Sequence, residues 1–321
     1  MKVLFIDTVH EVLEQRLTKE GFNCIDGTSW SREECKKILP EMTGIVIRSR
    51  FPMDEDFLQH ATQLKFIARS GAGMENIDLN YTEKQNILCF NAPEGNRNAV
   101  GEHALSMLLA LFNQLIKGDR EVRQGIWDRE GNRGIELDGK TVGIIGYGNN
   151  GNAFAKKLSG FDVKVLAFDK YKTNYGDQYA EEARMKQIFE EADIFSFHIP
   201  QTEETLFMGN KAFLDNFKKP IYLINLARGK IVRIKDLLEA IDEGKVLGAC
   251  LDVLEFESSS FESTSSQNEN EIFSKLINNE KVILSPHVGG WSVESYFKLS
   301  NVLADKILSH KNLILNTTTD K

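Results

Sequence analysis

Three closely spaced glycines follow an apolar run near the middle of the chain. The run 141–145 leads directly into Gly146, Gly148 and Gly151, which gives the pattern G-x-G-x-x-G at the start of a helical segment. Gly146 permits a tight turn, Gly148 lets the backbone approach a pyrophosphate, and Gly151 allows the helix to pack closely on the strand. The spacing therefore predicts a dinucleotide site. The other motif positions, which we count with the predicted cofactor site, are Tyr147, Asn149 and Asn150.

A carboxylate roughly 20 residues after the glycine motif indicates which dinucleotide is preferred. Asp169 directly follows the next apolar run, 163–168. There its carboxylate would accept both ribose hydroxyls and repel a 2′-phosphate, so the sequence favours NAD over NADP. Lys170 and Lys172 follow at once and stay open as residues that would tolerate such a phosphate, although solvated loop lysines are the plainer interpretation.

Three further polar residues follow later apolar runs, where ligands meet open α/β sheets. Arg228 comes after the run 221–225, and its guanidinium is suited to binding a carboxylate with two hydrogen bonds. His287 lies between Pro286 and two glycines and suits proton transfer near neutral pH. Glu257 is a candidate to hold the other ring nitrogen and raise the basicity of the imidazole. Each residue taken singly is more often structural.

Length, charge and cysteine usage bound the kind of protein. The 321 residues exceed one ordinary hydrophobic core, so two domains are expected. The formal net charge of −8 argues against nucleic acid or an anionic membrane as partner. The four cysteines lack C-x-x-C spacing, so we expect each to be a small buried apolar side chain in a reducing compartment. No metal site is expected. No signal sequence or membrane-spanning run is evident, so the sequence predicts a cytoplasmic protein.

Short apolar strands alternate with amphipathic helices, which predicts an α/β fold of two Rossmann-like or flavodoxin-like domains with parallel sheets. The strands expected in the first domain are 3–6, 23–25, 44–48, 65–68 and 87–90. The strands expected in the second are 142–145, 163–168, 194–197, 221–225, 247–251 and 282–284. A long helix over about 99–117 separates the two series, and much of its apolar face is expected in the core or in a dimer contact.

A last helix over about 292–308, with Ser292 as N-cap, is too short to form a domain. We expect it to return to the first half, so that the chain crosses twice between domains. The domains are then 1–98 with 289–321, which would bind substrate, and 99–288, which would bind the cofactor, with the active-site cleft between them. The polar, low-complexity segment 256–271 is expected to be a loop, with a lid beside the cleft as the less favoured alternative.

Together these segments resemble the D-isomer-specific 2-hydroxyacid dehydrogenases over nearly the whole chain, through 225–229, 248–253 and 286–290. The resemblance implies that Arg228 binds the substrate carboxylate and carbonyl, that His287 is the acid–base group and that Glu257 orients it. The residues that it assigns to the cofactor are Asp252, on the nicotinamide amide, and His198, Pro200, Thr202, Ala227 and Gly289. The residues that it assigns to the substrate carboxylate, through their backbone amides, are Ser70, Gly71, Ala72 and Gly73.

Within the family, the closest likeness is to the 3-phosphoglycerate dehydrogenases, through 47–50 and 91–96. Arg48 and Arg50 flank a serine at the end of a strand and form a candidate phosphate clamp, although one of them being a plain surface arginine stays open. The likeness implies NAD-dependent oxidation of 3-phosphoglycerate, a step of serine biosynthesis, by a homodimer or homotetramer. A glycerate dehydrogenase or hydroxypyruvate reductase, or an NAD(H)-sensing protein without turnover, remain alternatives.

Overall fold

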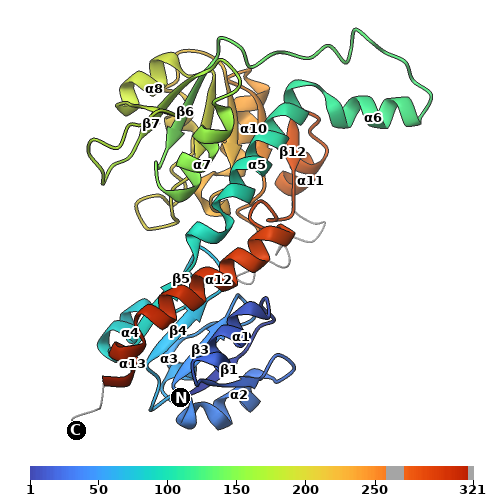
Figure 1. Cartoon of the computed structure of the whole chain (residues 1–321). Coiled ribbons are helices and arrows are strands. Elements are labelled where there is room, and N and C mark those ends of the chain that lie inside the picture. The colour runs from blue at the N-terminus through green and yellow to red at the C-terminus, as the bar shows by residue number, and fades with distance from the viewer. Residues whose placement is uncertain (258–270, 317–321) are drawn as a thin grey trace. The chain divides into compact units, whose positions relative to one another are not determined.

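The computed structural model describes residues 1–257 and 271–316, which form two compact α/β units (Figure 1). Within this part of the chain, unit 1 comprises residues 1–96 and 291–316, and unit 2 comprises 97–257 and 271–290. Both units are built on parallel sheets, which confirms the predicted fold class. Most of the segment 256–271, where a loop or lid was expected, lies outside the described residues, and the expected cleft between the domains stays a prediction.

Unit 1 contains a five-stranded parallel sheet with the order β2-β1-β3-β4-β5, which is the flavodoxin-like order. Its strands are β1 (Lys2–Phe5), β2 (Asn23–Asp26), β3 (Gly44–Ile47), β4 (Phe66–Arg69) and β5 (Leu88–Asn91). Its helices are α1 (Val12–Lys19), α2 (Arg32–Ile38), the 3₁₀ turn η1 (Leu39–Glu41), α3 (Glu55–Leu58), α4 (Leu79–Lys84), α12 (Val293–Ser309) and α13 (Lys311–Asn316). Each predicted strand forms, with its ends within one residue of the prediction.

The last long helix, α12, belongs to the core of unit 1. Ser292 caps its start, because its hydroxyl accepts the backbone N–H of Ser295. The helix packs on α1, β4 and β5 and buries Leu299, Leu303 and Ile307 there. The end of the described chain therefore belongs to unit 1. The short helix α13, which follows directly, was not predicted.

Unit 2 contains a seven-stranded parallel sheet with the order β12-β11-β10-β9-β6-β7-β8. Its strands are β6 (Thr141–Ile145), β7 (Lys164–Phe168), β8 (Glu181–Glu182), β9 (Ile194–Phe197), β10 (Ile221–Asn225), β11 (Val246–Leu251) and β12 (Val282–Leu284). Six of these strands match the prediction. The seventh, β8, consists of two exposed glutamates at the edge of the sheet and has no apolar run to reveal it.

The helix between the two series differs from the predicted span of 99–117. Helix α5 (Pro93–Phe112) starts earlier, with a proline at the first position, where no N–H is needed. It ends before Gln114, whose left-handed φ of 51° breaks the helix, and α6 (Leu115–Arg123) follows. The remaining helices of unit 2 are α7 (Asn149–Leu158), α8 (Met185–Glu191), α9 (Lys211–Leu214), the 3₁₀ turn η2 (Gly229–Ile231), α10 (Ile234–Asp242) and α11 (Glu271–Ile277).

Helix α6 projects from the body of unit 2, and none of its residues is buried (Figure 1). The large apolar side chains exposed on it and on residues 124–127 are Leu115, Ile116, Val122, Ile126 and Trp127. We call these five residues the α6 patch. Among the described residues, no single helix is long and apolar enough to cross a membrane, and α5 with α6 reaches such a length only across a bend of 59°.

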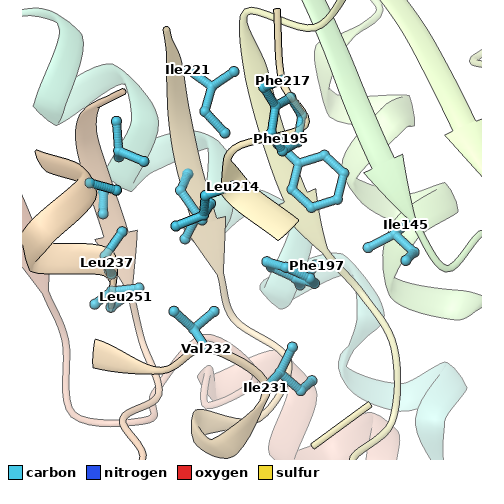
Figure 2. Packing of buried hydrophobic residues seen from close by; sticks show 14 of the residues in the cluster. Ile145, Phe195, Phe197, Leu214, Phe217, Ile221, Ile231, Val232, Leu237 and Leu251 are labelled. Atoms are coloured by element: carbon cyan, nitrogen blue, oxygen red, sulfur yellow. The ribbon is translucent and has the colours of Figure 1, made fainter. Parts of the chain in front are cut away.

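The core of unit 2 packs around aromatic rings from one face of β9 and from the segment after α9. Figure 2 shows Phe195, Phe197 and Phe217 within this cluster, surrounded by aliphatic side chains. The rings of Phe195 and Phe197 meet edge to face with centroids 4.9 Å apart, and Phe217 lies 5.1 Å from Phe195. Edge-to-face contacts of this kind add to the free energy of burial. The cluster makes the sheet a rigid support for the loops at its ends.

Candidate active site

The three residues predicted to carry chemistry lie after three neighbouring strands. Arg228 follows β10, Glu257 follows β11, and His287 follows β12, and the sheet order places these strands side by side. Because the strands are parallel, their carboxyl ends share one edge of the sheet. The structure therefore brings these loops, which are distant in sequence, to the same end of unit 2.

His287 and Glu257 form a direct hydrogen-bonded pair. Nδ1 of His287 lies 2.7 Å from Oε2 of Glu257, and the two side chains are 23% and 13% exposed. The other carboxylate oxygen of Glu257 accepts the backbone N–H of Leu254, which fixes its orientation. An ionised carboxylate can only accept, so Nδ1 carries the proton and Nε2 is the basic atom of the neutral ring. This is the arrangement that general acid–base chemistry requires.

The turn that carries Arg228 packs directly on the turn that carries the glutamate. Buried Asn225 shapes the first turn by accepting the N–H of Ala227 and donating to the carbonyl oxygen of Arg228. A Cβ atom on Gly229 would lie 1.9 Å from the carbonyl oxygen of Leu254. Only glycine fits there, and its absence of a side chain lets the two turns touch.

Asp252 holds the histidine loop from beneath. Its carboxylate is 2% exposed and accepts the hydroxyl of Ser285 at 2.6 Å and the N–H groups of Val288 and Gly289 at 2.9 and 2.7 Å. Burial alone would raise the pKa of Asp252, but the His103 ring beside it and the hydrogen bonds from Ser285, Gly289 and Val288 outweigh burial and lower the pKa. Asp252 therefore stays ionised. Its predicted contact with nicotinamide stays a prediction.

The glycine motif has the shape that a pyrophosphate requires. Gly146 has a left-handed φ of 90°, and a Cβ there would lie 2.5 Å from the carbonyl oxygen of His198. A Cβ on Gly151 would lie 2.1 Å from the carbonyl oxygen of Gly146, so the helix approaches the strand as predicted. A Cβ on Gly148 would meet no atom within 4 Å, which leaves the space above the first turn of α7 open. The residues present fit a dinucleotide.

Asp169 faces the glycine motif from the end of β7. One carboxylate oxygen accepts the N–H of Tyr147 at 3.0 Å, and the other accepts a backbone N–H two residues further on. Both lysines considered as phosphate ligands have partners within the protein. Lys172 donates to the carbonyl oxygen of Tyr147 at 2.7 Å, and Lys170 forms an ion pair with Glu204. Asp169 and Lys172 thus both contact Tyr147 of the motif, Asp169 as an acceptor and Lys172 as a donor.

The loop after β9 lies where the strand order reverses, between β9 and β6, which is where open α/β sheets bind ligands. Nε2 of His198 lies 2.8 Å from the hydroxyl of buried Ser196, and burial lowers the pKa of His198 to about 4. The histidine is therefore neutral at physiological pH. The hydroxyl of Thr205 stiffens the loop, since it bonds the carbonyl oxygen of Pro200 and the N–H of Thr202.

The predicted substrate loop belongs to unit 1 and follows β4. Ser70 is buried, and its N–H donates to the carbonyl oxygen of Ile47, while the N–H of Gly71 bonds within the turn. Within the described residues, the amides of Ala72 and Gly73 have no hydrogen-bond partner. Two of the four predicted amides are therefore committed to the fold, and two are available to an anionic ligand.

Part of the predicted phosphate clamp, Arg48 and Arg50, is already hydrogen-bonded within the protein. One carboxylate oxygen of Asp7 accepts all three backbone N–H groups of 48–50, at 2.6 to 3.3 Å. The guanidinium of Arg50 donates to the carbonyl oxygens of two neighbouring segments at 2.9 and 3.2 Å. The guanidinium of Arg48 instead stacks on the ring of Trp291 at 4.1 Å. The two arginines, which the sequence treats alike, have different surroundings.

Comparison with known proteins identifies the family of this chain. Residues 105–289 match the model described as D-isomer specific 2-hydroxyacid dehydrogenase, NAD binding domain. The chain belongs to the D-isomer-specific 2-hydroxyacid dehydrogenase family. The match covers most of unit 2, where the glycine motif and the histidine–glutamate pair lie, so NAD is the cofactor that both the family and the motif indicate.

Two similar proteins show the range of activities among the relatives. The chain is 33% identical over 314 residues to the D-3-phosphoglycerate dehydrogenase of Archaeoglobus fulgidus, which covers 96% of this chain and 57% of that protein. It is 32% identical over 276 residues to the hydroxypyruvate reductase of Thermotoga maritima, which covers 86% of this chain and 87% of that protein. The chain thus spans little more than half of the first relative.

Solved structures agree on the fold. The D-lactate dehydrogenase of Aquifex aeolicus, complexed with NAD and lactic acid, has a TM-score of 0.80 at 25% identity, over 98% of this chain and 96% of that one. A D-2-hydroxyisocaproate dehydrogenase has a TM-score of 0.83 at 23% identity, over 99% of each chain. The two-domain Rossmann-type architecture of this family is therefore established for the chain.

The lowered pKa of His198 predicts a pH dependence of stability. The unfolded chain takes up a proton on this histidine near its ordinary pKa of 6.5, whereas the folded protein does so only near 4. Stability should therefore rise with pH between about 4 and 6.5, by up to about 1.4 kcal/mol per unit from this group. The His198→Gln variant should lose that component, as measured by urea unfolding at several pH values. Identical pH dependence in both proteins would contradict the assignment.

Proposed function

We propose that the chain is an NAD-dependent dehydrogenase that transfers a hydride between C2 of a D-2-hydroxy acid and NAD. The observation that carries this proposal is the 2.7 Å contact between His287 and Glu257, at the same end of unit 2 as the glycine motif. A protein that only senses NAD(H) needs the motif but gains nothing from an oriented, basic histidine. The pair therefore favours turnover over sensing.

The residues proposed to hold the cofactor are the first turn of α7 for the pyrophosphate and Asp169 for the ribose hydroxyls. When bound, the nicotinamide ring accepts or supplies the hydride. The neutral His198 beside the motif adds no charge of its own there. Because both carboxylate oxygens of Asp169 are already oriented by backbone N–H groups, they can accept ribose hydroxyls without rearrangement.

The reacting groups are proposed to come from the three neighbouring loops. In the direction of oxidation, Nε2 of His287 takes the hydroxyl proton of the substrate, and Glu257 stabilises the imidazolium that results. Arg228 binds the carboxylate and stabilises charge on the carbonyl oxygen as it forms. In unit 1, the open amides of Ala72 and Gly73 are proposed to bind an anionic group of the substrate.

The first experiment is a screen of NADH oxidation with 2-oxo acids, followed by the His287→Ala variant on the best substrate. Removal of the proton-transfer group should lower kcat by about 10²–10⁴-fold. NADH binding, measured by fluorescence titration, should stay close to wild type. His60→Ala is the matched control, because His60 is exposed and is not among the predicted site residues. A His287→Ala variant with more than half of wild-type turnover would exclude the proposed role.

For the substrate we propose 3-phosphoglycerate, oxidised to 3-phosphohydroxypyruvate as in serine biosynthesis. Similarity to D-3-phosphoglycerate dehydrogenases from Archaeoglobus fulgidus and Bacillus subtilis supports this choice, at 33% and 32% identity. Arg48 supplies the charge that a phosphate needs, since its guanidinium is held by a ring and not by a carboxylate. A cytoplasmic location is proposed with this role.

A second candidate substrate is an unphosphorylated hydroxy acid such as glycerate. Two observations favour it: Asp7 already places a negative charge against the amides of 48–50, and the guanidinium of Arg50 is bound to backbone carbonyls. The hydroxypyruvate and glyoxylate reductases that resemble the chain are also covered over 87% and 82% of their length. One pair of variants separates the two candidates.

Arg48→Ala should raise KM for 3-phosphohydroxypyruvate by about ten- to hundredfold, which is the worth of one charge-assisted hydrogen bond. The kcat should hardly change, because the contact is made equally in ground and transition states. Arg50→Ala should have the smaller effect on KM, since its guanidinium is engaged by the fold. Unphosphorylated hydroxypyruvate is the control substrate. If both substrates suffer equally, or neither does, the phosphoglycerate proposal fails.

We further propose that the α6 patch binds a second copy of the chain, in a homodimer or homotetramer. Exposed apolar residues grouped on one projecting helix are typical of interaction surfaces. Trp127, which is 79% exposed, is the largest of them. Trp127→Glu should reduce the mass measured by sedimentation equilibrium. An unchanged mass would place the contact elsewhere.

A further inference from the structure

A second histidine lies beneath the loop that carries His287. His103 belongs to α5, and its Nε2 atom lies 2.9 Å from the hydroxyl oxygen of Ser285 and 3.5 Å from the carboxylate of Asp252. Ser285 in turn donates to Asp252 at 2.6 Å. The sequence gives no hint of this contact, because His103 and Ser285 are separated by 182 positions.

The direction of these hydrogen bonds fixes the state of His103. A serine hydroxyl has one proton to donate, and the buried carboxylate of Asp252 is the stronger acceptor. The hydroxyl of Ser285 therefore accepts from His103, which must carry a proton on Nε2. The result is a chain of donors that runs from the His103 ring through the serine hydroxyl to the aspartate.

The loop at the end of this chain needs support. His287 has a left-handed φ of 55°, which is unfavourable for a residue with a Cβ atom and persists only where surrounding contacts enforce it. Those contacts come from Asp252: its carbonyl oxygen accepts the N–H of His287 at 2.8 Å, and its carboxylate accepts those of Val288 and Gly289. A shift of the carboxylate would shift the loop.

The ring of His103 also packs on the loop itself. A Cβ atom on Gly289 would lie 3.4 Å from Cδ2 of His103, so the ring covers that glycine. Met107, one turn further along α5, brings its sulfur within 3.5 Å of the Ser285 hydroxyl. One face of α5 thus contacts the histidine loop through both hydrogen bonding and packing.

We infer that His103 is a positioning residue for His287, acting through Ser285 and Asp252 to hold the loop in which Nδ1 of His287 meets Glu257. This inference rests on the proposed function, since it assigns His287 the proton transfer. His103 itself touches neither substrate nor cofactor in this role. Its contribution is the Nε2–H group, which keeps the serine hydroxyl directed at the carboxylate.

The test compares two substitutions of similar size. His103→Leu removes the donor, whereas His103→Gln keeps an N–H group at nearly the same distance from the backbone. The leucine variant should lose about tenfold in kcat, the loss expected for one hydrogen bond, with little change in KM. The glutamine variant should stay within about threefold of wild type. Ser106→Ala, an exposed position of the same helix, is the control.

Two further measurements keep the test decisive. Ser285→Ala breaks the same chain of donors without changing α5, so its effect on kcat should not add to that of His103→Leu in the double variant. Hydrogen exchange of the Val288 and Gly289 amides, followed by mass spectrometry, should be faster in the leucine variant than in wild type. The exchange needs no substrate.

The outcomes divide clearly. Equal impairment of the leucine and glutamine variants, full activity of both, or unchanged amide exchange in the leucine variant would overturn the inference. If His103→Leu does not fold, Ser285→Ala and the glutamine variant decide the question. If wild type reduces no 2-oxo acid, the proposed function fails, and amide exchange alone decides whether His103 anchors the loop.

Discussion

The site depends on one buried carboxylate. Removing an ion from water is unfavourable by several kcal/mol unless donors replace the lost hydration, and Asp252 receives donors from a serine and from two backbone amides, while His103 donates to that serine. The loop after β12 obtains in return a fixed acceptor for its N–H groups, which an irregular segment cannot find within itself. The strained backbone of His287 persists because the carboxylate of Asp252 has its donors and the N–H groups of the loop have their acceptor. The pairing of His287 with Glu257, and any chemistry that this pair performs, depends on the loop being held in this way.

Much of the fold could be predicted from the sequence for a simple physical reason. Central strands of parallel sheets are buried on both faces and therefore appear as continuous apolar runs. All six apolar runs of unit 2 form strands, including β12, which lies at the edge of the sheet and is partly buried. The failures occur where burial gives no signal. The two-residue strand β8 is exposed, and α5 begins at Pro93 in a polar stretch before its apolar residues. The break at Gln114 depends on a backbone angle that apolar spacing does not record.

In the candidate site too, residues within a recognisable segment could be predicted, whereas contacts between segments far apart in the sequence could not. Arg228, Glu257 and His287 could be predicted because each follows an apolar run in a recognisable segment. The role of His103 could not be predicted, because a single histidine on a helix has no distinctive spacing. Its contact with Ser285 depends on the whole fold of unit 2. Arg48 and Arg50 show that residues with the same sequence context can have different surroundings in the fold. Their spacing is symmetric, yet the fold binds one guanidinium to carbonyl oxygens and leaves the other stacked on a ring.

The short strand β8 also determines how the sheet of unit 2 ends. An open sheet edge presents unpaired N–H and C=O groups, which invite a strand from another molecule. Here the edge consists of Glu181 and Glu182, with Lys164 of the neighbouring strand 3.9 Å from the first carboxylate. A second copy that approached edge to edge would bring four carboxylates together along a ladder only two residues long. Like-charge repulsion thus opposes edge-to-edge pairing of two copies along β8.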